Sequence, residues 1–420
     1  MRKQAFGHVM VAAALVALAA CGNSSDVSSG AGSGGFVTQP VAASGTRVGF
    51  WAGENFVGAP QGTDPAGGTY WAPRDTSPYT AELWSTLGSL RVPVYFQMRY
   101  KRDFGPLPAE QPVRDDTLPI LRQAQQAGVP LWAWLIVPYS DGYFATGGNA
   151  QEQFDAVREL QAWAQRNGIL FQGVALDLEP PYQTFANASS AISGISAILA
   201  SMERNLDPAA QCQAMHTYES IVAWANSRNI SITGAPMPFS ADDLVDGHLA
   251  LQNAFDYIVA PAGWHALYFQ AYRSTIGQFV GGIDPGSGIV SSYFRSAQQY
   301  FGKAGQVSLA TPGGVGYATV DDMAHDVRML ATLGAGDVPI YSLELALKSY
   351  GLDGVRQLAA AAQQPFSGSE ARTETAPTAE AEAVRVIFSG LDLTAVVATP
   401  LVTGTAGKTQ LPNAWPDGCP

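Results

Sequence analysis

Two acidic residues stand close together at the end of an apolar stretch of this chain. Residues 171–181 read Phe-Gln-Gly-Val-Ala-Leu-Asp-Leu-Glu-Pro-Pro, in which one residue separates Asp177 from Glu179. Side chains alternate along a β-strand, so these two carboxyl groups would share one face. Two like charges in a partly dry site raise the pKa of one group, which can donate a proton while its ionised neighbour stabilises positive charge. Cleavage of a glycosidic bond requires this division of labour.

Glu344 is a third carboxylate that could take part in this chemistry. It follows an apolar stretch that would be the last of eight strands. In an eight-stranded barrel the fourth and eighth strands face each other. Glu179 and Glu344 could then act as an acid and a nucleophile about 5 Å apart, or as an inverting pair at a wider separation. The alternative is that Glu344 caps or anchors the helix that follows its strand.

Side chains that could bind a sugar recur near the predicted strand ends. Aromatic rings stack on the C–H faces of sugars, and polar side chains between them can bond to hydroxyl groups. We therefore predict as substrate-binding residues Trp51, Tyr95, Gln97, Arg99, Trp134, Trp264, His265 and Tyr341. The alternative for each aromatic ring is that it fills the protein core.

The elements that must position these residues follow a repeating pattern. Eight short apolar stretches occur at 48–51, 92–97, 130–136, 173–179, 230–234, 257–260, 307–310 and 338–343. Such runs are typical of parallel strands covered on both faces, and amphipathic helix patterns lie between most of them. The alternation predicts a single α/β domain, a (β/α)8 TIM barrel over residues 46–365. An open doubly wound sheet would need a glycine-rich phosphate turn after an early strand, and the sequence has none there.

Composition narrows the ligands that the chain could bind. The formal net charge is −12 and the basic residues form no cluster, which argues against nucleic acid as a partner. No clustered histidines accompany the carboxylates, so we expect neither a metal nor another cofactor. The glycine-rich stretch 311–316 could bind phosphate, but Lys348 is the only basic residue that we expect close to the loops after the seventh and eighth strands. We expect a carbohydrate partner and a monomer.

The 171–179 segment resembles the fourth-strand signature of family 18 glycoside hydrolases, the chitinase-like barrels. That signature reads Phe-Asp-Gly-Ile-Asp-Ile-Asp-Trp-Glu, and Phe171, Gly173, Asp177 and Glu179 match it. Residues 341–344, Tyr-Ser-Leu-Glu, are similar to the family's Trp-Ser-Leu-Asp at the eighth strand. The resemblance implies that Glu179 is the proton donor and that Asp177 orients an N-acetyl group of the substrate.

The same segment also departs from the signature. Gln172 and Ala175 replace its first two aspartates, and Leu178 replaces its tryptophan. The resemblance therefore favours a glycoside hydrolase of the cell envelope over a chitinase in particular. Two alternatives stay open, because a fold does not determine a function. One is a catalytically inactive barrel that binds glycan, and the other is an unrelated barrel enzyme that uses Glu344.

The ends of the chain indicate export and anchoring. Residues 1–20 begin with basic side chains and continue with an apolar run too short to span a bilayer, which is typical of a signal peptide. Leu18-Ala-Ala-Cys21 resembles the lipobox of bacterial lipoproteins, which implies acylation of Cys21. Residues 21–45 are rich in Gly, Ser and Ala and would be a flexible tether. We expect a protein of the cell envelope, facing the periplasm or the cell surface and held by lipid alone.

Two further features concern the C-terminal part of the chain. Residues 366–420 include a low-complexity segment, and we expect an irregular extension there. Cys212 and Cys419 could form a disulfide in an oxidising compartment, and two free thiols are the alternative.

Replacing Cys21 tests the lipid anchor. Cys21→Ser removes the thiol that acylation requires, so the exported protein should move from the membrane fraction to the soluble fraction. Cell fractionation followed by immunodetection measures this change. A wild-type protein that is already soluble after export would contradict the lipoprotein interpretation.

Overall fold

The structure, a computed structural model, describes residues 45–54, 74–100, 117–138, 141–182, 207–247, 249–259, 263–311 and 316–403. Eight parallel strands form a closed barrel in chain order, with β8 paired to β1. The strands are β1 Arg47–Ala52, β2 Val94–Arg99, β3 Leu131–Ile136, β4 Phe171–Leu178, β5 Ser231–Pro236, β6 Ala266–Gln270, β7 Gly305–Ala310 and β8 Asp337–Tyr341. The predicted (β/α)8 barrel is confirmed.

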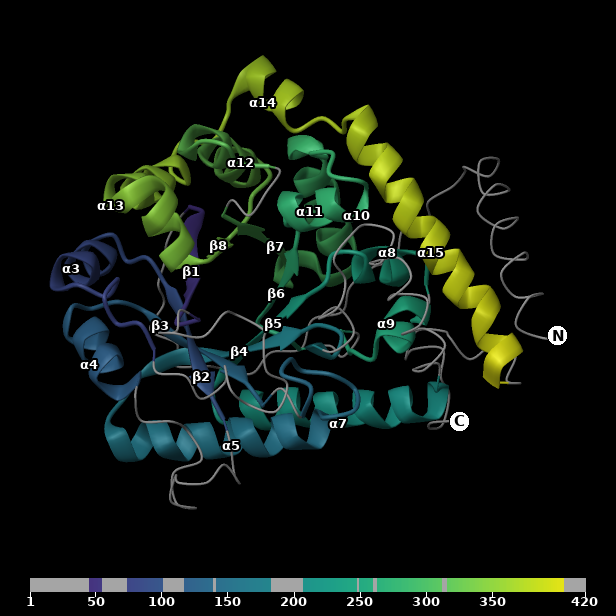
Figure 1. The fold of residues 1–420 in the computed structure, drawn as a ribbon, viewed down its shortest axis with the longest axis horizontal. Helices are drawn as coiled ribbons and strands as arrows, with labels where there is room; N and C mark the ends of the chain where they lie inside the picture. The colour runs from purple at the N-terminus through teal and green to yellow at the C-terminus, as the bar shows by residue number, and fades with distance from the viewer. Residues whose placement is uncertain are drawn as a thin grey trace.

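Helices surround this barrel (Figure 1). Those between the strands are α3 Ala81–Ser89, α4 Leu118–Gln126, α5 Ala150–Asn167, α7 Pro208–Asn226, α8 Ser240–Val245, α9 Ala250–Phe255, α10 Arg273–Phe279, α11 Gly286–Phe301 and α12 Val320–Thr332, with a short 3-10 helix at Gly302–Ala304. Of these helices, α4, α7 and α11 pack directly on the strands, as does α13 Leu343–Ala361 after the last strand. Local sequence sets the helix ends. Thr319 and Asp322 form a reciprocal capping box at the start of α12, and Gly168 ends α5 in a left-handed conformation.

Two apolar clusters, inside and outside the barrel, hold the fold together. The outer cluster lies between strands and helices and includes Phe96, Leu176 and Leu330. The inner cluster consists mainly of aromatic rings from alternate strand positions, because every second side chain points inward. Trp51 and Tyr95 are in contact there with ring centroids 4.7 Å apart. The barrel is therefore filled, and a ligand has to bind at one of its ends.

The sixth strand lies nine residues later than the sequence pattern predicts. Residues 257–259 are buried but are not a strand, and β6 begins at Ala266. Their backbone amides are already bonded to α9: Tyr257 N donates to the Gln252 carbonyl at 3.1 Å, and Val259 N donates to the Gln252 side chain at 2.9 Å. A short buried apolar run looks the same in sequence whether or not it joins the sheet. The prediction of a strand over 257–260 was wrong.

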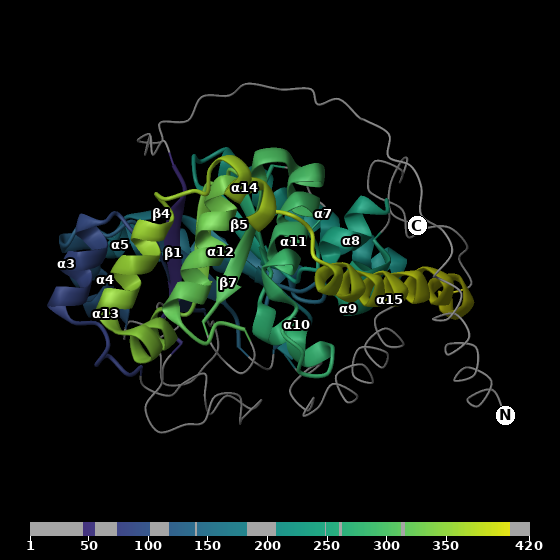
Figure 2. The same ribbon diagram turned by 90° about the horizontal axis from the view of Figure 1, so that it is seen from above.

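The C-terminal extension is not irregular over 368–403. After α13 Leu343–Ala361, the chain forms α14 Gly368–Glu374 and the long α15 Ala379–Thr403. Helix α15 packs against α8, α9 and α11 (Figure 2). Phe388 stacks on Phe239 at 5.7 Å, and Arg385 forms an ion pair with the buried Asp242. The packed body therefore extends beyond the expected boundary at residue 365.

Several sequence predictions fall outside the described residues. These include the signal over 1–20, almost all of the tether over 21–45, the acylated Cys21, and Cys419. Cys212 is buried on α7 and takes part in a disulfide, but its pairing with Cys419 stays a prediction. Among the described helices, none combines the length and the apolar character needed to cross a bilayer.

Breaking the Arg385–Asp242 pair should destabilise the fold. Arg385 also donates to Ser292 at 2.8 Å and Ser296 at 3.0 Å, and the pair is largely removed from water. Removing one partner leaves a buried charge, so Arg385→Ala should lower the free energy of unfolding by about 3–5 kcal/mol. The measurement is chemical denaturation at pH 8, because burial raises the pKa of Asp242 to about 7 and the carboxyl is then ionised.

Arg158→Ala is the matched control for this experiment. Arg158 forms an exposed pair with Asp155 at 3.7 Å, which should contribute no more than about 1 kcal/mol. Equal effects of the two substitutions would show that α15 does not depend on the buried pair.

Candidate active site

The carboxyl groups of Asp177 and Glu179 meet at the C-terminal end of β4. Asp177 points into the barrel and is 6% exposed, while Glu179 lies one step beyond the strand and is half-buried. The Gln270 amide nitrogen, from the end of β6, lies 3.0 Å from Asp177 Oδ1 and 2.6 Å from Glu179 Oε1. It also lies 3.0 Å from the Ala235 carbonyl of β5. One amide thus holds both acids against neighbouring strands.

Burial makes this pair retain a proton. Burial, followed by the charge of Glu179, raises the pKa of Asp177 well above its usual range. Burial also raises the pKa of Glu179 to about 7, although hydrogen bonds from Gln270 and Asp177 oppose this. The two carboxyl groups are hydrogen-bonded to each other, so they titrate as one unit. Near neutral pH the pair can therefore give a proton to a bound molecule.

Glu54 brings another carboxylate to the same end of the barrel. It follows β1 and accepts hydrogen bonds on both oxygens, from the Tyr143 hydroxyl at 2.7 Å and from the Tyr341 hydroxyl. Burial raises the pKa of Glu54, and both hydroxyls oppose the rise. The charge of Glu54 in turn raises the pKa values of Asp177 and Glu179. Glu54 therefore acts electrostatically on the acid pair from another strand.

Sequence reasoning missed Glu54 because strand alternation breaks just before it. Gly53 has a φ of +95°, a left-handed conformation that side chains rarely adopt, so the chain turns there. A Cβ at this position would also lie 2.9 Å from the Arg74 guanidinium. The available signal was an acid two residues after an apolar stretch, next to a glycine.

Glu344 anchors the turn that presents Glu54. Its Oε1 accepts a hydrogen bond from Gly53 N at 2.6 Å and another from the Tyr79 hydroxyl. The cap of α13 comes instead from Ser342, whose hydroxyl accepts from Leu345 N at 3.4 Å. Glu344 therefore holds the β1 turn, a different role from capping its own helix.

Four of the predicted substrate-binding residues lie at or just below this site. Tyr341 bonds to Glu54, and Trp134 meets Tyr341 edge-on at 6.3 Å. Gln97 is fully buried and donates to the Tyr143 hydroxyl at 3.0 Å, so it positions that tyrosine. Trp51 lies lower, where its indole nitrogen donates to Ser308 at 3.1 Å. These residues form the floor and the supports of the site.

Arg99 and Arg74 bring positive charge to this end of the barrel. Arg99 is buried at the last position of β2, on the same face as Gln97. Arg74, which the sequence did not single out, donates to the Gln97 carbonyl at 2.8 Å. The charge of Arg74 lowers the pKa of Glu54.

The structure places Trp264 and His265 at the opposite end of the barrel and Tyr95 in its interior. The Tyr95 hydroxyl donates to Tyr268 at 3.0 Å, near Asp337 at the start of β8. Trp264 and His265 come just before β6, whereas the predicted strand over 257–260 would have put them after it. Trp264 and His265 therefore lie away from the acid pair, and Tyr95 fills the barrel interior.

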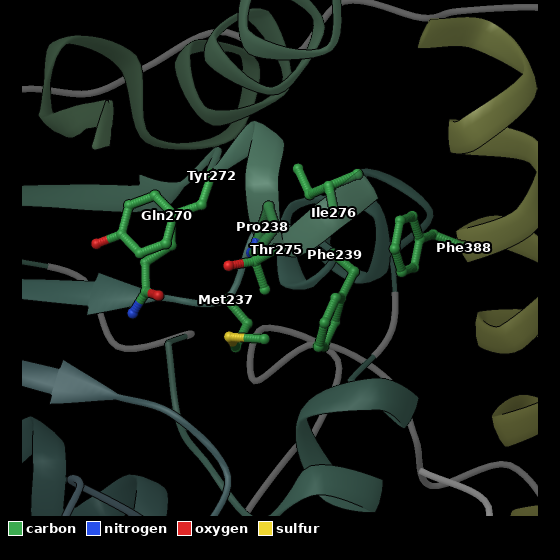
Figure 3. Close-up of a pocket in the computed structure, with 8 residues that line it drawn as sticks. All are labelled: Met237, Pro238, Phe239, Gln270, Tyr272, Thr275, Ile276 and Phe388. Atoms are coloured by element: carbon green, nitrogen blue, oxygen red, sulfur yellow. The ribbon is translucent and has the colours of Figure 1, made fainter. Parts of the chain in front are cut away.

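Two hollows include residues near the acids, Gln270 in one and Pro181 in the other. One is a small apolar cavity behind Gln270 and Tyr272, closed by Met237, Phe239, Ile276 and Phe388 (Figure 3). The volume that the centre of a water molecule can occupy is about 10 Å³. The cavity can therefore hold one water molecule or methyl group but not a sugar ring. The other is an open polar hollow of about 440 Å³ that includes Asp141, Thr146, Asn149, Glu152, Pro181 and Asp256. Its volume is large enough for a sugar ring.

Among the described residues, no three His, Cys, Asp or Glu side chains are grouped so that they could bind a metal. The predicted phosphate loop over 311–316 falls mostly outside the described part of the chain. The described site offers a carboxyl pair that retains a proton, set among hydroxyl and amide donors.

No protein-family model and no curated protein matches the chain. Among solved structures, it is similar to a GH18 chitinase from Pseudoalteromonas aurantia at 14% identity and a TM-score of 0.44, covering 74% of this chain and 99% of that one. It is also similar to a putative chitinase A from Streptomyces coelicolor, at 12% identity and a TM-score of 0.43, covering 76% of this chain and 98% of that one. A GH5-4 broad specificity endoglucanase from an uncultured bacterium is similar at 11% identity and a TM-score of 0.44, covering 76% of this chain and 93% of that one. Likenesses this distant assign no role to any residue.

The pKa of Glu179 can be measured directly. Because burial raises it, the carboxyl carbon should titrate at about pH 7 in ¹³C NMR, and Glu179→Gln identifies the signal. Glu54→Gln should lower the midpoint by removing a nearby negative charge. Gln270→Leu should raise it by removing a hydrogen bond to the ionised form. A midpoint near 4.5 in the folded protein would contradict this account of the site.

Proposed function

We propose that this protein is a glycoside hydrolase in which Glu179 protonates the leaving oxygen of a poly- or oligosaccharide. The observation that supports the proposal best is the hydrogen-bonded Asp177–Glu179 pair, which retains a proton near neutral pH at the C-terminal end of a barrel. Barrel enzymes place their active sites at this end. The fourth-strand resemblance points to the same two residues.

The hydrogen bonds of the pair suit the charge changes of glycoside cleavage. Before the reaction the two carboxyl groups share one proton. When Glu179 gives it to the leaving oxygen, both groups become ionised while positive charge develops on the sugar ring. The Gln270 amide is already in place to stabilise the resulting negative charge, and Asp177 stabilises the positive charge on the sugar.

The surroundings of the acids favour an extended glycan over a small ligand. The open hollow of about 440 Å³ includes Pro181, two residues after Glu179, so a second sugar unit could lie there. Tyr272 stacks on Tyr341 at 6.2 Å and adds an aromatic surface to the site. The resemblance to family 18 makes 2-acetamido sugars the first substrates to test.

The place of action that we propose is the cell envelope. The lipobox-like Leu18-Ala-Ala-Cys21 would anchor the protein, and residues 21–45 would allow the barrel to reach a glycan at some distance from the membrane. Polysaccharides of the envelope or its surroundings are therefore the natural panel for an activity screen.

Glu179→Gln tests the proposed acid. The substitution keeps the shape and a hydrogen-bonding group but removes the proton, so turnover should fall by about 10²–10⁴-fold with little change in glycan binding. Substrates with a very good leaving group should recover part of the rate, because they need less protonation. In the wild type, kcat/KM should decrease as the pH rises through about 7, where Glu179 loses its proton.

Glu82→Gln is the matched control, since Glu82 is exposed on α3 and should leave the rate unchanged. Reducing-end release from a polysaccharide panel measures the activity. Full activity of Glu179→Gln would place the acid elsewhere. A wild type that binds glycan but releases no reducing ends would instead support the inactive glycan-binding alternative.

A further inference from the structure

Helix α15 reaches the candidate site from outside the barrel. Its Phe388 lines the same small cavity as Gln270, and the two side chains lie on opposite sides of it (Figure 3). Phe388 is 2% exposed and Gln270 is 6% exposed, so both are withdrawn from solvent. Gln270 bonds to Asp177 and Glu179. One small cavity therefore separates the last helix from the amide that contacts both acids.

The cavity offers water few partners. Its apolar lining residues are Met237, Pro238, Phe239, Ile276 and Phe388. The Gln270 amide nitrogen bonds to the acids, and the Tyr272 hydroxyl lies 3.4 Å from the Ser308 hydroxyl, so both polar groups have partners elsewhere. A buried water molecule needs two or more polar partners, and small apolar cavities stay dry. The space behind the Gln270 amide is therefore a dry one.

The Phe388 ring is fixed in position. It stacks on Phe239 at 5.7 Å, with the two ring planes 23° apart. Three residues earlier on the same face of α15, Arg385 forms the ion pair with Asp242. Asp392, which is buried on the same helix, raises the pKa of Asp242 through its charge. A stacked ring and a buried ion pair thus hold this part of α15 against the barrel.

We propose that Phe388 is a positioning residue for the acid pair: its ring keeps water from the Gln270 side chain and, through that side chain, from Asp177 and Glu179. The inference rests on the proposed glycoside hydrolase function, in which this pair supplies the proton. Phe388 acts through Gln270 and is not itself a catalytic residue. The proposal makes the C-terminal helix part of the machinery that keeps the acids protonated.

Loss of the Phe388 ring should make the acid pair ionise more readily. Burial is the largest cause that raises the pKa values of Asp177 and Glu179. Water behind Gln270 would lower the cost of ionising the carboxyl groups, so their pKa values should fall. A looser Gln270 amide would act in the opposite direction, but its hydrogen bond affects the pKa of Glu179 less than burial does. The net shift should therefore be downward.

Other groups face the acid pair from elements that α15 does not hold. Glu54 after β1 raises the pKa values of both acids through its charge, and the indole N–H of Trp134 on β3 lowers the pKa of Asp177. Tyr272 and Tyr257, from the segments after β6 and α9, lie within electrostatic reach of the pair. Substitutions at position 388 leave all of these groups unchanged, so a shift would report on the cavity.

Phe388→Ala in the full chain tests the inference. In ¹³C NMR, the midpoint of the Glu179 carboxyl carbon should fall from about pH 7 by about one pH unit. Once a glycan substrate is found, kcat/KM at pH 8 should fall by about tenfold, because the protonated fraction falls by that factor. At pH 5 it should change by less than about twofold, since the acid stays protonated there. A merely structural disturbance would lower the rate equally at both pH values.

Phe388→Met and Val386→Ala are the matched controls. Methionine fills irregular apolar space, so Phe388→Met should keep the wild-type midpoint. Val386 is 53% exposed on the same helix, and its truncation should change neither the midpoint nor the pH profile. If Phe388→Ala does not fold, Phe388→Val opens the cavity less and should shift the midpoint in the same direction by a smaller amount. Circular dichroism and thermal melting establish that each variant is folded.

An unchanged or higher midpoint in folded Phe388→Ala or Phe388→Val would overturn this inference. So would an equal loss of kcat/KM at pH 5 and pH 8, or a midpoint in Phe388→Met as low as in Phe388→Ala. The NMR titration does not require hydrolysis. A wild type without any hydrolytic activity would therefore reject the proposed function while the titration still tested the role of Phe388, so the two failures are distinguishable.

Discussion

The crowding of carboxyl groups at one end of the barrel is the constraint on which the site depends. Four acids, Asp177, Glu179, Glu54 and Glu344, come from three different elements and are partly withdrawn from water. Their mutual repulsion would be costly without hydrogen-bond donors. The donors are Gln270, Tyr143, Tyr341, Tyr79 and the Gly53 amide. Because these groups are distant in sequence, the arrangement exists only when the barrel is closed, and burial in the closed barrel raises the pKa values of Asp177, Glu179 and Glu54.

Much of the architecture could be predicted because it depends on local patterns. Apolar runs separated by amphipathic helices indicated the barrel, and alternation along 171–179 placed Asp177 and Glu179 together. The prediction of the sixth strand was wrong for a physical reason. The apolar run over 257–260 lies against α9, where a glutamine side chain bonds to its backbone, and sequence patterns carry no information about that partner. The same error placed Trp264 and His265 at the wrong end and concealed Gln270.

The remaining parts of the site depend on turns and on tertiary contacts. Glu54 is presented by a left-handed glycine, and Tyr143 reaches it from a strained loop, so neither follows the alternation of a strand. The role of Glu344 was open in sequence because an acid after a strand can serve catalysis or anchoring equally well. Its hydrogen bond to Gly53 connects β8 to the β1 turn, and only the folded barrel brings these two segments together.

Helix α15 contributes to more than the outer wall of the protein. Phe388 on this helix and Gln270 at the acid pair line the same small cavity, from opposite sides (Figure 3). Helix α15 therefore closes the cavity next to the Gln270 amide, which bonds to both acids. In evolutionary terms, the unit that forms the candidate site is longer than the eight-fold repeat. A recombination event that transferred the barrel without its C-terminal helix would leave this cavity open on one side, so that water would reach the Gln270 amide that bonds to both acids.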